Sequence, residues 1–471
     1  MSQTLPNPAE PRGVGPLPPG PTAPWWGLPL LRRMQADYLG FTGGLRRDYG
    51  DVTYMRLGWE RAWDVFDPEL VRAVLVDEAD HLVRWERGIE VLEQVFGQSV
   101  LVTEGESWRR QRRMLQAAFT PAKVAGYAAL MRDAARSGLD AALPAGAAEG
   151  VVAMDPLFAR LAMDVILRTL FSRPAADDAA AAADAVQLLS ETAMREMFQP
   201  FTLPDWLPLP GKAAKRRAIR TLKSLVRGHI DARRDAPAQP DLLGMLLALR
   251  DVEGGGALSP AEVFDQCMVS FQAGHETTAT ALLWWSALIA EHPEAAARAR
   301  AEVDALGGDP GPEHLVALPW LTATLKEAMR LYPPVAALMT RRTTAPIAIG
   351  PWPLPRGAVI RITPAIIQRD PRWFERPDEF VPERFMPGAP VIPRGAWMPF
   401  GAGPRVCLGQ HFALLEMTLI AAMLLQRYTL EGPLDAGWRV ADVNVTLRPR
   451  RPVRLRLRRR GDQPAVGPAG R

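Results

Sequence analysis

The stretch FGAGPRVCLG at residues 400–409 joins an aromatic residue, a glycine- and proline-containing loop, an arginine and one of only two cysteines in the chain. The apolar run FALLEMTLIAAMLL that follows predicts a helix beginning near Cys407, whose N-terminus would favour a thiolate. Arg405, two residues before the cysteine, adds positive charge. A thiolate needs a partner. The residues alone leave two possible partners for the thiolate. One is a substrate, with Cys407 as nucleophile and His411 as its base, and the other is a metal ion.

The best-bounded element of the sequence lies at residues 259–292. Ser259 is expected to cap a long helix that ends before Pro293, and Glu262 completes a capping box. At about 1.5 Å per residue this helix is about 48 Å long. The segment AGHETT (residues 273–278) in its middle contains a glycine and two threonines, which are poor helix formers. The glycine either packs against a neighbouring helix or the segment belongs to a functional site.

The composition excludes several classes of protein. With 2 cysteines in 471 residues, the chain holds neither a disulfide scaffold nor an iron–sulfur cluster, which needs about four cysteines. A net charge of +4 gives no extended basic field, so no nucleic-acid partner is expected. No run approaches the roughly 18 apolar residues of a membrane span, and the first 24 residues lack the apolar core of a signal peptide. We therefore expect a cytoplasmic protein with no membrane span.

The expected fold class is mainly α with a minor antiparallel β-sheet. A hairpin turning at Gly58 is predicted near the N-terminus, and strands return after Pro334. Between them, residues 121–291 are predicted to be all helix, and the arginine-rich residues 448–460 to form a terminal strand. No internal repeat is visible. One large domain at residues 25–460 is expected, between a proline-rich tail at residues 1–24 and a C-terminal tail at residues 461–471.

The cysteine stretch resembles the ligand loop of the cytochrome P450 family, F-x-x-G-x-R-x-C-x-G, at all five fixed positions: Phe400, Gly403, Arg405, Cys407 and Gly409. Three further segments follow the order of that family. AGHETT resembles its oxygen-activation segment, KEAMR supplies the pair Glu327 and Arg330, and PERF contains Arg384. One departure is Gln368, where many relatives carry histidine, and we interpret it as peripheral. The resemblance covers residues 25–460 and implies a cytochrome P450 haem-thiolate catalytic domain with a long central helix.

The resemblance implies a haem b cofactor. Cys407 is the implied axial ligand of the iron, Phe400 packs beside it, and Gly403 and Gly409 bring backbone close to sulfur and porphyrin. On a helix expected to be capped by Ser107, some arginines face the haem, while Arg110 is expected to be solvated and Arg109 and Arg113 to face a docking partner. The implied propionate contacts are Trp108, Arg112, Arg341 and Arg405. Glu327, Arg330 and Arg384 are implied to form a structural brace.

The resemblance also implies a reaction. Thr277 and Glu276 match the family's alcohol and acid, which deliver protons while O2 is activated, and one oxygen atom enters a C–H bond of an apolar substrate such as a fatty acid or terpenoid. Electrons come from NAD(P)H through a ferredoxin or flavodoxin with its reductase. The alternatives are a haem-thiolate peroxygenase that uses H2O2, and a haem-binding sensor or carrier without turnover. The expected substrate pocket comprises Phe271, Ala273, Val335, Ala336, Leu338 and Met339.

Two further segments bear on the substrate. His81, Arg84 and Arg87 either anchor a carboxylate, which would favour a fatty acid, or are surface residues. The segment at residues 198–211 carries many apolar side chains in a proline-stiffened connection. It is interpreted as a mouth for lipid-like substrate, as a contact with a membrane surface, or as a loop packed on the helices below.

Overall fold

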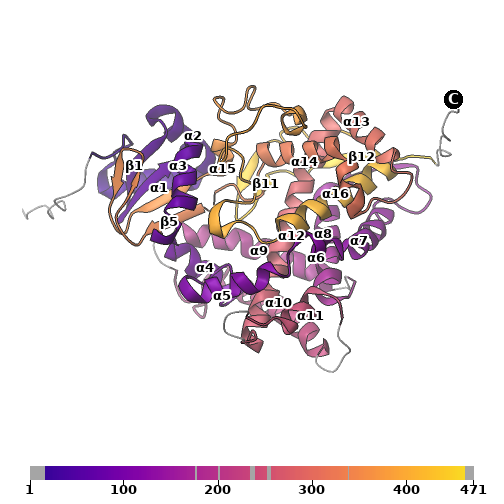
Figure 1. Ribbon diagram of the computed structural model, residues 1–471, viewed down its shortest axis with the longest axis horizontal. Coiled ribbons are helices and arrows are strands. Elements are labelled where there is room, and N and C mark those ends of the chain that lie inside the picture. The colour runs from indigo at the N-terminus through magenta and orange to yellow at the C-terminus, as the bar shows by residue number, and fades with distance from the viewer. Residues whose placement is uncertain are drawn as a thin grey trace, which may run out of the picture. The chain divides into compact units, whose positions relative to one another are not determined.

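The computed structural model describes residues 16–174, 178–199, 202–233, 239–251, 256–337 and 339–461. These residues form two compact units (Figure 1). The first unit takes its described residues from Met1–Trp85, Ala337–Ile367 and Pro393–Val406, and the second takes them from Glu86–Ala336, Gln368–Ile392 and Cys407–Arg471. The predicted tails lie outside the described residues up to residue 15 and from residue 462.

The first unit is built on a five-stranded sheet of order β1-β2-β8-β5-β3. The predicted hairpin is present, with Val52 opposite Val65 and Gly58 in its turn at a φ of +64°. The other neighbours pair antiparallel except β2 and β8, which run parallel, so the sheet is not purely antiparallel as expected. The strands are β1 Val52–Leu57, β2 Glu60–Val65, β3 Leu82–Arg84, β5 Met339–Thr343 and β8 Val359–Ile362, with a separate hairpin of β6 Ile347–Ile349 and β7 Trp352–Leu354.

Short helices surround this sheet. Asp67 caps α3 by accepting hydrogen bonds from the N–H groups of Glu69 and Leu70, as its position before a proline predicted. Residues 16–23 lie in coil, and the carbonyl of Pro19 accepts a hydrogen bond from the N–H of Tyr54, so this part of the predicted tail is attached to β1. The helices are α1 Pro24–Ala36, α2 Tyr38–Tyr49, α3 Pro68–Arg72, η1 Ala73–Asp77, η2 Ala79–His81, α15 Pro364–Ile367 and η5 Gly403–Arg405.

The second unit is mostly helical. Its longer helices are α4 Glu86–Phe96, α5 Gly105–Gln116, α7 Ala128–Asp140, α8 Met154–Phe171, α9 Asp178–Met197, α10 Lys212–Arg233, α12 Pro260–Glu291, α13 Pro293–Asp304, α14 Pro319–Leu331 and α16 Gln410–Arg427. Its shorter ones are α6 Pro121–Ala125, α11 Leu242–Ala248, η3 Pro312–Ala317 and η4 Pro382–Phe385. None of the described helices, in either unit, has both the length and the apolar character needed to cross a membrane.

A three-stranded sheet of order β4-β12-β9 corrects the expectation that residues 121–291 are all helix. Strand β4 (Glu149–Ala153) lies within that range and pairs antiparallel with the arginine-rich β12 (Arg454–Arg459), with Ala153 opposite Arg454. Leu455 and Leu457 of β12 are buried, which confirms the predicted terminal strand with one wet face. The remaining strands are β9 Tyr428–Glu431, β10 Ala441–Val443 and β11 Leu447–Pro449.

Helix α12 begins and ends where the sequence predicts, with the capping box of Ser259 and Glu262 formed. It packs against α8, and a Cβ on Gly274 would approach Cδ1 of Ile166 to 2.9 Å. The glycine therefore has the packing role that was one of its two interpretations. Most of the helix is buried, and in its middle only one face remains accessible.

Candidate functional site

The cysteine stretch is divided between the two units, because the first ends at Val406 and the second resumes at Cys407. Helix α16 begins at Gln410 with Gly409 as its N-cap, three residues later than predicted. The side chain of Cys407 is accessible, yet the surrounding protein desolvates its sulfur.

That desolvation raises the pKa of the Cys407 thiol, whereas the backbone N–H of Gly409 and the charge of Arg112 act to lower it. The expected effect of the helix N-terminus does not dominate, so a thiolate here needs a bound cation. Arg112, rather than the exposed His411, is the side chain whose charge acts on the sulfur. This environment favours the metal-ligand hypothesis over the nucleophile.

Arg112 is half-buried on α5 and is suited to hold an anion. Its Nε is buried and has no hydrogen-bond partner among the described residues, and desolvation lowers the pKa of its guanidinium. Trp108, one turn earlier, is also half-buried. The N-cap of this helix is Glu104, so the expectation that Ser107 caps it is wrong.

The other arginines of α5 differ from expectation. Arg110 forms an ion pair with Glu262 in the first turn of α12 and is not merely solvated. Arg113 lies 3.4 Å from Asp251, so it is not the free docking residue that was predicted. Arg109 is exposed and lies 3.6 Å from Glu106, which leaves it as the accessible member of the pair.

The first unit carries several of the predicted haem contacts. Phe400 is half-buried, Arg405 ends η5, and Arg341 lies on β5, where it donates a hydrogen bond to the carbonyl of Thr340 at 3.1 Å. Met339, a predicted pocket residue, is half-buried on the same strand.

The structure gives a backbone reason for glycine at one of the two motif positions, Gly403, and none at Gly409. Gly403 has a φ of +71°, and a Cβ there would lie 1.9 Å from the carbonyl oxygen of Leu75, so the protein backbone itself requires glycine. Gly409 has an ordinary φ of −83°, and its Cβ would lie 3.9 Å from Sγ of Cys407, a normal contact. The sulfur therefore does not exclude a side chain at Gly409.

The accessible face in the middle of α12 is made of small residues. Ala273 is exposed, and Ser270, Gly274 and Thr277 are half-buried, at helical spacings of three and four. The hydroxyl of Thr277 donates a hydrogen bond to the carbonyl of Ala273 at 2.7 Å. Phe271 is fully buried because its position faces the core, so its assignment to the substrate pocket is wrong.

Glu276 is buried on a different side of α12 from this face. Its Oε1 accepts a hydrogen bond from the hydroxyl of Thr446 at 2.7 Å. Desolvation raises its pKa, while Thr446 and the charge of Arg448 act to lower it. Arg448 in turn pairs with Asp155 at 2.9 Å. The carboxyl that was expected to link Thr277 with solvent is thus held away from Thr277 in this structure.

The predicted pocket segment after α14 is less open than expected. Val335 is half-buried, but Ala336 is only 2% exposed, so it packs inside the protein and does not line an open pocket. Leu338 lies outside the described residues.

The structure brings Glu327, Arg330 and Arg384 together. Arg330 donates to Glu327 at 2.7 and 2.8 Å, and Arg384 lies 3.4 Å from the same carboxylate. Arg330 also donates to the carbonyls of Gln368, Pro377 and Glu379. These bonds tie α14 to residues 368–384.

Gln368 belongs to this brace, so its interpretation as peripheral is wrong. It is fully buried, and its Nε2 donates to the carbonyls of Met329 and Arg330 at 3.0 Å each. The amide caps carbonyls at the end of α14, where no further helical N–H groups are available to them.

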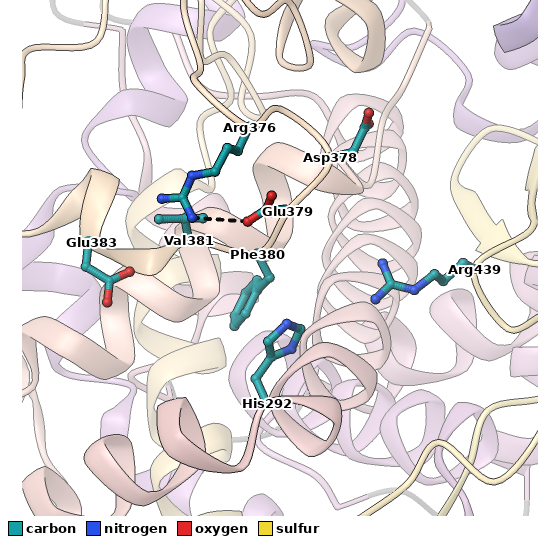
Figure 2. Close-up of a pocket in the computed structure, with 8 residues that line it drawn as sticks. All are labelled: His292, Arg376, Asp378, Glu379, Phe380, Val381, Glu383 and Arg439. Carbon is teal, nitrogen blue, oxygen red and sulfur yellow. Dashed lines mark hydrogen bonds and ion pairs between the residues drawn. The ribbon is translucent and has the colours of Figure 1, made fainter.

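A cavity of about 480 Å³ lies beside the brace (Figure 2). Figure 2 shows that the side chains lining the cavity are mostly charged. Arg376 points toward Glu379, and its Nη1 lies 3.1 Å from Oε2 of that carboxylate. It contains none of the predicted catalytic or cofactor-binding residues. Its lining is His292, Arg376, Asp378, Glu379, Phe380, Val381, Glu383 and Arg439.

Sequence reasoning missed two polar residues beside the candidate site. Glu416 on α16 is fully buried, and desolvation raises its pKa well above the usual value. A single acid within the apolar run after Cys407 was a signal that could have found it. Thr446 had no such signal, because its contact with Glu276 joins positions far apart in the sequence.

Comparison with known proteins agrees with this arrangement. The chain matches the family model described as cytochrome P450 over residues 17–456. It is 33% identical to cyclooctat-9-en-7-ol 5-monooxygenase of Streptomyces melanosporofaciens over 89% of this chain and 94% of the relative. It is also 33% identical to pentalenene oxygenase of Streptomyces avermitilis over 87% of this chain and 90% of the relative.

The fold is similar to that of the crystal structure of the cytochrome P450DA heme domain, with a TM-score of 0.83 over 95% of this chain and 98% of that one, at 24% identity. The family model and the two curated relatives each cover most of the chain. The chain therefore belongs to the cytochrome P450 family and is a haem-thiolate monooxygenase.

Proposed function

We propose that this monooxygenase hydroxylates a terpenoid, with electrons delivered from NAD(P)H by a separate ferredoxin or flavodoxin and its reductase. The observation that carries the proposal is the accessible face of α12, where the small side chains of Ser270, Ala273 and Thr277 leave room for a bulky apolar molecule. The names of two bacterial relatives specify cyclooctat-9-en-7-ol and pentalenene, an alkenol and an alkene. Such substrates need apolar space and no anchoring charge.

The residues favoured as a carboxylate anchor support a fatty acid less well. His81 lies 2.8 Å from Glu78, and Arg87 donates to the carbonyl of Glu196 at 2.7 Å. Both are engaged by the protein itself. A terpenoid without a carboxylate is therefore the better match.

The proposed cofactor is haem b with Cys407 as the iron ligand. The donor set fits, because the desolvated thiol needs a cationic partner and the unpartnered Nε of Arg112 suits an anionic propionate. Bound through a thiolate, haem supplies the activation of dioxygen. The other proposed contacts are Trp108, Arg341, Arg405, Phe400, Ala273 and Gly409.

Thr277 and Glu276 are the proposed proton-delivery pair. In this structure the Thr277 hydroxyl donates a hydrogen bond to the carbonyl of Ala273. The hydroxyl must break this bond before it can donate to an acceptor on the substrate side. Glu276 holds its proton at higher pH than an ordinary carboxyl, because burial raises its pKa. To reach Thr277, the carboxyl must release Thr446.

The test uses the purified haem protein. Reduced protein with carbon monoxide is expected to show the red-shifted Soret band of thiolate ligation, and Cys407→Ala to lose it. Thr277→Ala is expected to keep the band while product formed per NAD(P)H falls. Retention of the band in Cys407→Ala would overturn the ligand, and an unchanged coupling ratio in both Thr277→Ala and Glu276→Gln would overturn the proton-delivery pair.

Substrate class and oxidant are separated in the same system. Cyclic terpenes are expected to shift the Soret band more strongly than fatty acids of similar size. Turnover is expected with NAD(P)H and surrogate redox proteins. Turnover with H2O2 but not with NAD(P)H and redox proteins would identify a peroxygenase, and turnover under neither condition would identify a sensor or carrier.

A further inference from the structure

Helix α5, which carries Arg112, contacts the N-terminal part of α12 through two buried glutamines. Gln111, the residue before Arg112, is 1% exposed, and Gln266 of α12 is fully buried. The Nε2 of Gln266 donates a hydrogen bond to Oε1 of Gln111 at 3.1 Å. Burial of an amide costs free energy unless its donors and acceptors find partners, so the remaining bonds of the two glutamines decide what this contact does.

Both amides find partners in the segment that follows α4. Oε1 of Gln266 accepts from the N–H of Val100 at 3.1 Å, and Nε2 of Gln111 donates to the carbonyl of Gln98 at 3.0 Å. Oε1 of Gln111 also accepts from the hydroxyl of Thr103 at 3.2 Å. These two glutamines and their bonds to residues 98–103 form an amide clasp. Because the bonds are directional and buried, the amide clasp fixes one arrangement of α5 against α12.

The segment at residues 97–103 is also attached to α12 independently of Gln266. The N–H of Gln98 donates to Oδ2 of Asp265 on α12 at 2.8 Å. Gly97 has a φ of +54°, and a Cβ there would lie 2.3 Å from Oδ1 of the same carboxylate, so this close approach requires glycine. The segment therefore has a fixed position on α12 before α5 bonds to it.

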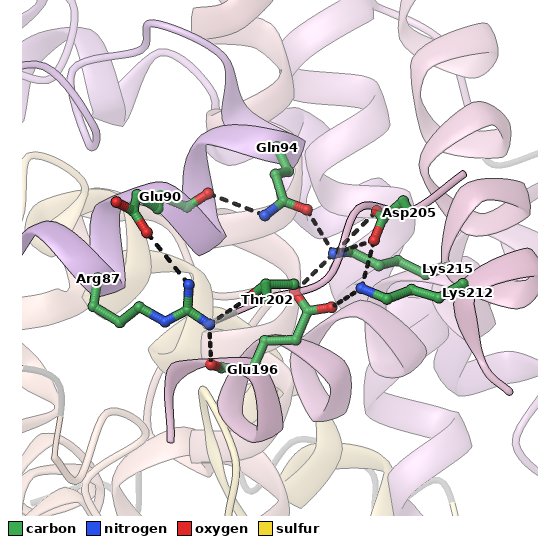
Figure 3. Close-up of polar contacts among 8 residues, drawn as sticks. All are labelled: Arg87, Glu90, Gln94, Glu196, Thr202, Asp205, Lys212 and Lys215. Atoms are coloured by element: carbon green, nitrogen blue, oxygen red, sulfur yellow. Dashed lines mark hydrogen bonds and ion pairs between the residues drawn. The ribbon is translucent and has the colours of Figure 1, made fainter. Parts of the chain in front are cut away.

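Helix α4, which leads into this segment, is anchored to two other helices (Figure 3). The Nζ of Lys215 on α10 donates to Oε1 of Gln94, and Arg87 donates to the carbonyl of Glu196 on α9 at 2.7 Å. In Figure 3 these side chains meet between the three helices. The amide clasp therefore bonds α5 to a segment that is held at α12 and, through α4, at α9 and α10.

The amide clasp determines the direction in which Arg112 points. Successive side chains of an α-helix are turned by about 100°, so the direction of Arg112 is set once Gln111 faces α12. In that direction Arg112 is half-buried, and its charge acts on the sulfur of Cys407. A slip of α5 by one residue would turn Arg112 by about 100° and move it about 1.5 Å along the helix axis.

The amide clasp is also in line with the accessible face of α12. Gln266, Ser270, Ala273 and Thr277 are at positions i, i+4, i+7 and i+11, which share one stripe of a helix. Thr277 lies about 16 Å along the axis from Gln266. Arg112 and Thr277, although they are on different helices, are thus placed relative to each other through one contact.

We propose that Gln111 and Gln266 are positioning residues for the cofactor, because the amide clasp fixes the rotation of α5 and so holds Arg112 where it binds a haem propionate. This inference rests on the proposed haem site, in which Arg112 is that contact. The ion pair of Arg110 with Glu262 joins the same two helices, but both side chains are partly exposed, and such pairs contribute little. The neutral amides are the contact that sets the rotation.

The experiment measures the rate at which the holoprotein releases haem to an excess of a haem-free globin. Gln266→Met and Gln111→Met keep an unbranched side chain of similar length but remove its hydrogen bonds. Each is expected to release haem about tenfold faster than the unaltered protein, because the displaced guanidinium loses a charge-assisted hydrogen bond to the propionate. Arg112→Ala is expected to release haem at least as fast.

A double-mutant cycle separates positioning from a general loss of stability. If the amide clasp acts through Arg112, Gln266→Met is expected to accelerate haem release no further in the Arg112→Ala background. The matched control is Gln272→Met, at another buried glutamine of α12, whose Oε1 has no hydrogen-bond partner among the described residues. Gln272→Met and Arg110→Ala are both expected to release haem at the unaltered rate.

A milder variant covers the case in which neither methionine variant retains haem. Thr103→Val removes one hydrogen bond of the amide clasp and leaves both glutamines in place, so it is expected to accelerate release by a smaller factor. The reduced carbon monoxide spectrum of every variant that retains haem is expected to keep the thiolate band, because none of the substitutions removes Cys407.

Two results would overturn the inference and leave the proposed haem site intact. The first is release at the unaltered rate from Gln266→Met and Gln111→Met while Arg112→Ala releases haem faster. The second is equal acceleration by Gln266→Met with and without Arg112, which would show that the clasp contributes only general stability. Unaltered release from Arg112→Ala, in contrast, would overturn the propionate contact itself and the inference with it.

Discussion

The brace around Arg330 and the interior between α12 and α16 both bury polar groups, but they satisfy them differently. In the brace, Arg330 donates to one carboxylate and to three carbonyls. Between the helices, Thr278 and Glu416 are buried with side-chain oxygens that have no hydrogen-bond partner among the described residues. The first arrangement stabilises the fold, and the second costs stability.

At these two places the difference follows the proposed role, although buried polar atoms without a partner also occur elsewhere in the described residues, such as Nε1 of Trp63. The unsatisfied groups lie on the helix that carries Thr277 and on the helix that follows Cys407. Proteins tolerate such a cost where chemistry requires it and offset it elsewhere. The brace, which contains no group proposed to meet substrate, is a place where the cost is offset.

Of the variants that test this contrast, Arg330→Ala is expected to lower the unfolding free energy most. It leaves Glu327 buried without its main partner and three carbonyls without a donor, which costs about 3–5 kcal/mol of unfolding free energy. Urea unfolding measures the loss, with Lys326→Ala on the same helix as the control. Should Arg330→Ala fail to fold, the more peripheral Arg384→Ala gives a smaller measurable loss; a loss below that of the Lys326 control in either variant would contradict the brace.

Glu416→Gln tests the unsatisfied side of the contrast. Desolvation raises the pKa of Glu416 in the folded protein, so the folded state binds a proton that the unfolded chain releases above its ordinary pKa of about 4.5. The stabilisation is present below that value and is lost as the pH rises toward the folded pKa, by up to about 1.4 kcal/mol per pH unit.

Relative to the unaltered protein, Glu416→Gln is therefore expected to become more stable as the pH increases. The hydroxyl of Thr278 is near enough to act on the carboxyl but does not reach hydrogen-bond geometry, so it does not offset this loss. Urea unfolding at several pH values measures the trend, with the exposed Glu375→Gln as control. Parallel stability curves for Glu416→Gln and the unaltered protein would mean that Glu416 is solvated or paired.

Gln368→Ala probes the brace at a neutral group. It removes two hydrogen bonds to the carbonyls of Met329 and Arg330, at a cost of about 1–2 kcal/mol. The bond from Arg330 to the main-chain carbonyl of residue 368 remains, which keeps the loss below that of Arg330→Ala. Gln368→His retains one hydrogen-bond donor, so it is expected to lose less unfolding free energy than Gln368→Ala. The control is Gln187→Ala, at an exposed position. If both variants lost the same unfolding free energy, Gln368 would not contribute to the brace.

Much of the fold was predictable because its signals are local. The capping box and the flanking prolines set the bounds of α12, and alternation around Gly58 set the hairpin. The fold class was confirmed, as was the family through the cysteine motif. Strand β4 was missed because a short strand inside a helical region is defined by its partner β12, about 300 residues later in the chain.

The candidate site was predictable by motif but not by environment. The resemblance to the family, rather than the spacing alone, placed Glu327, Arg330 and Arg384 in one network, and the structure brings them together. Burial was not predictable, so Phe271 and Ala336 were assigned to a pocket although they lie in the core. Ion-pair partners distant in sequence, such as Asp251 for Arg113, could not be predicted either.

Thr446→Val is expected to have the smallest effect, and it acts on the carboxyl nearest the proposed chemistry. The threonine is held firmly, since the N–H of the following Leu447 donates to the carbonyl of Pro334 at 2.9 Å and the carbonyl of Leu447 accepts from Trp284 at 2.7 Å. Its hydroxyl favours the ionised form of Glu276. Besides Thr446, the groups that act on this carboxyl include Ser190 on α9, Arg448 on β11 and Asp155 on α8.

Removing that hydroxyl therefore raises the pKa of Glu276 further. Infrared titration of the carboxyl band assigned with Glu276→Gln measures the change, and the pH at which coupling falls is expected to move in the same direction. Thr446→Ser restores the hydroxyl and the original midpoint. Thr280→Val removes a buried hydroxyl of α12 that does not reach Glu276 and leaves the midpoint unchanged. If Thr446→Val titrates like the unaltered protein while Glu276→Gln still lowers coupling, the acid acts without Thr446.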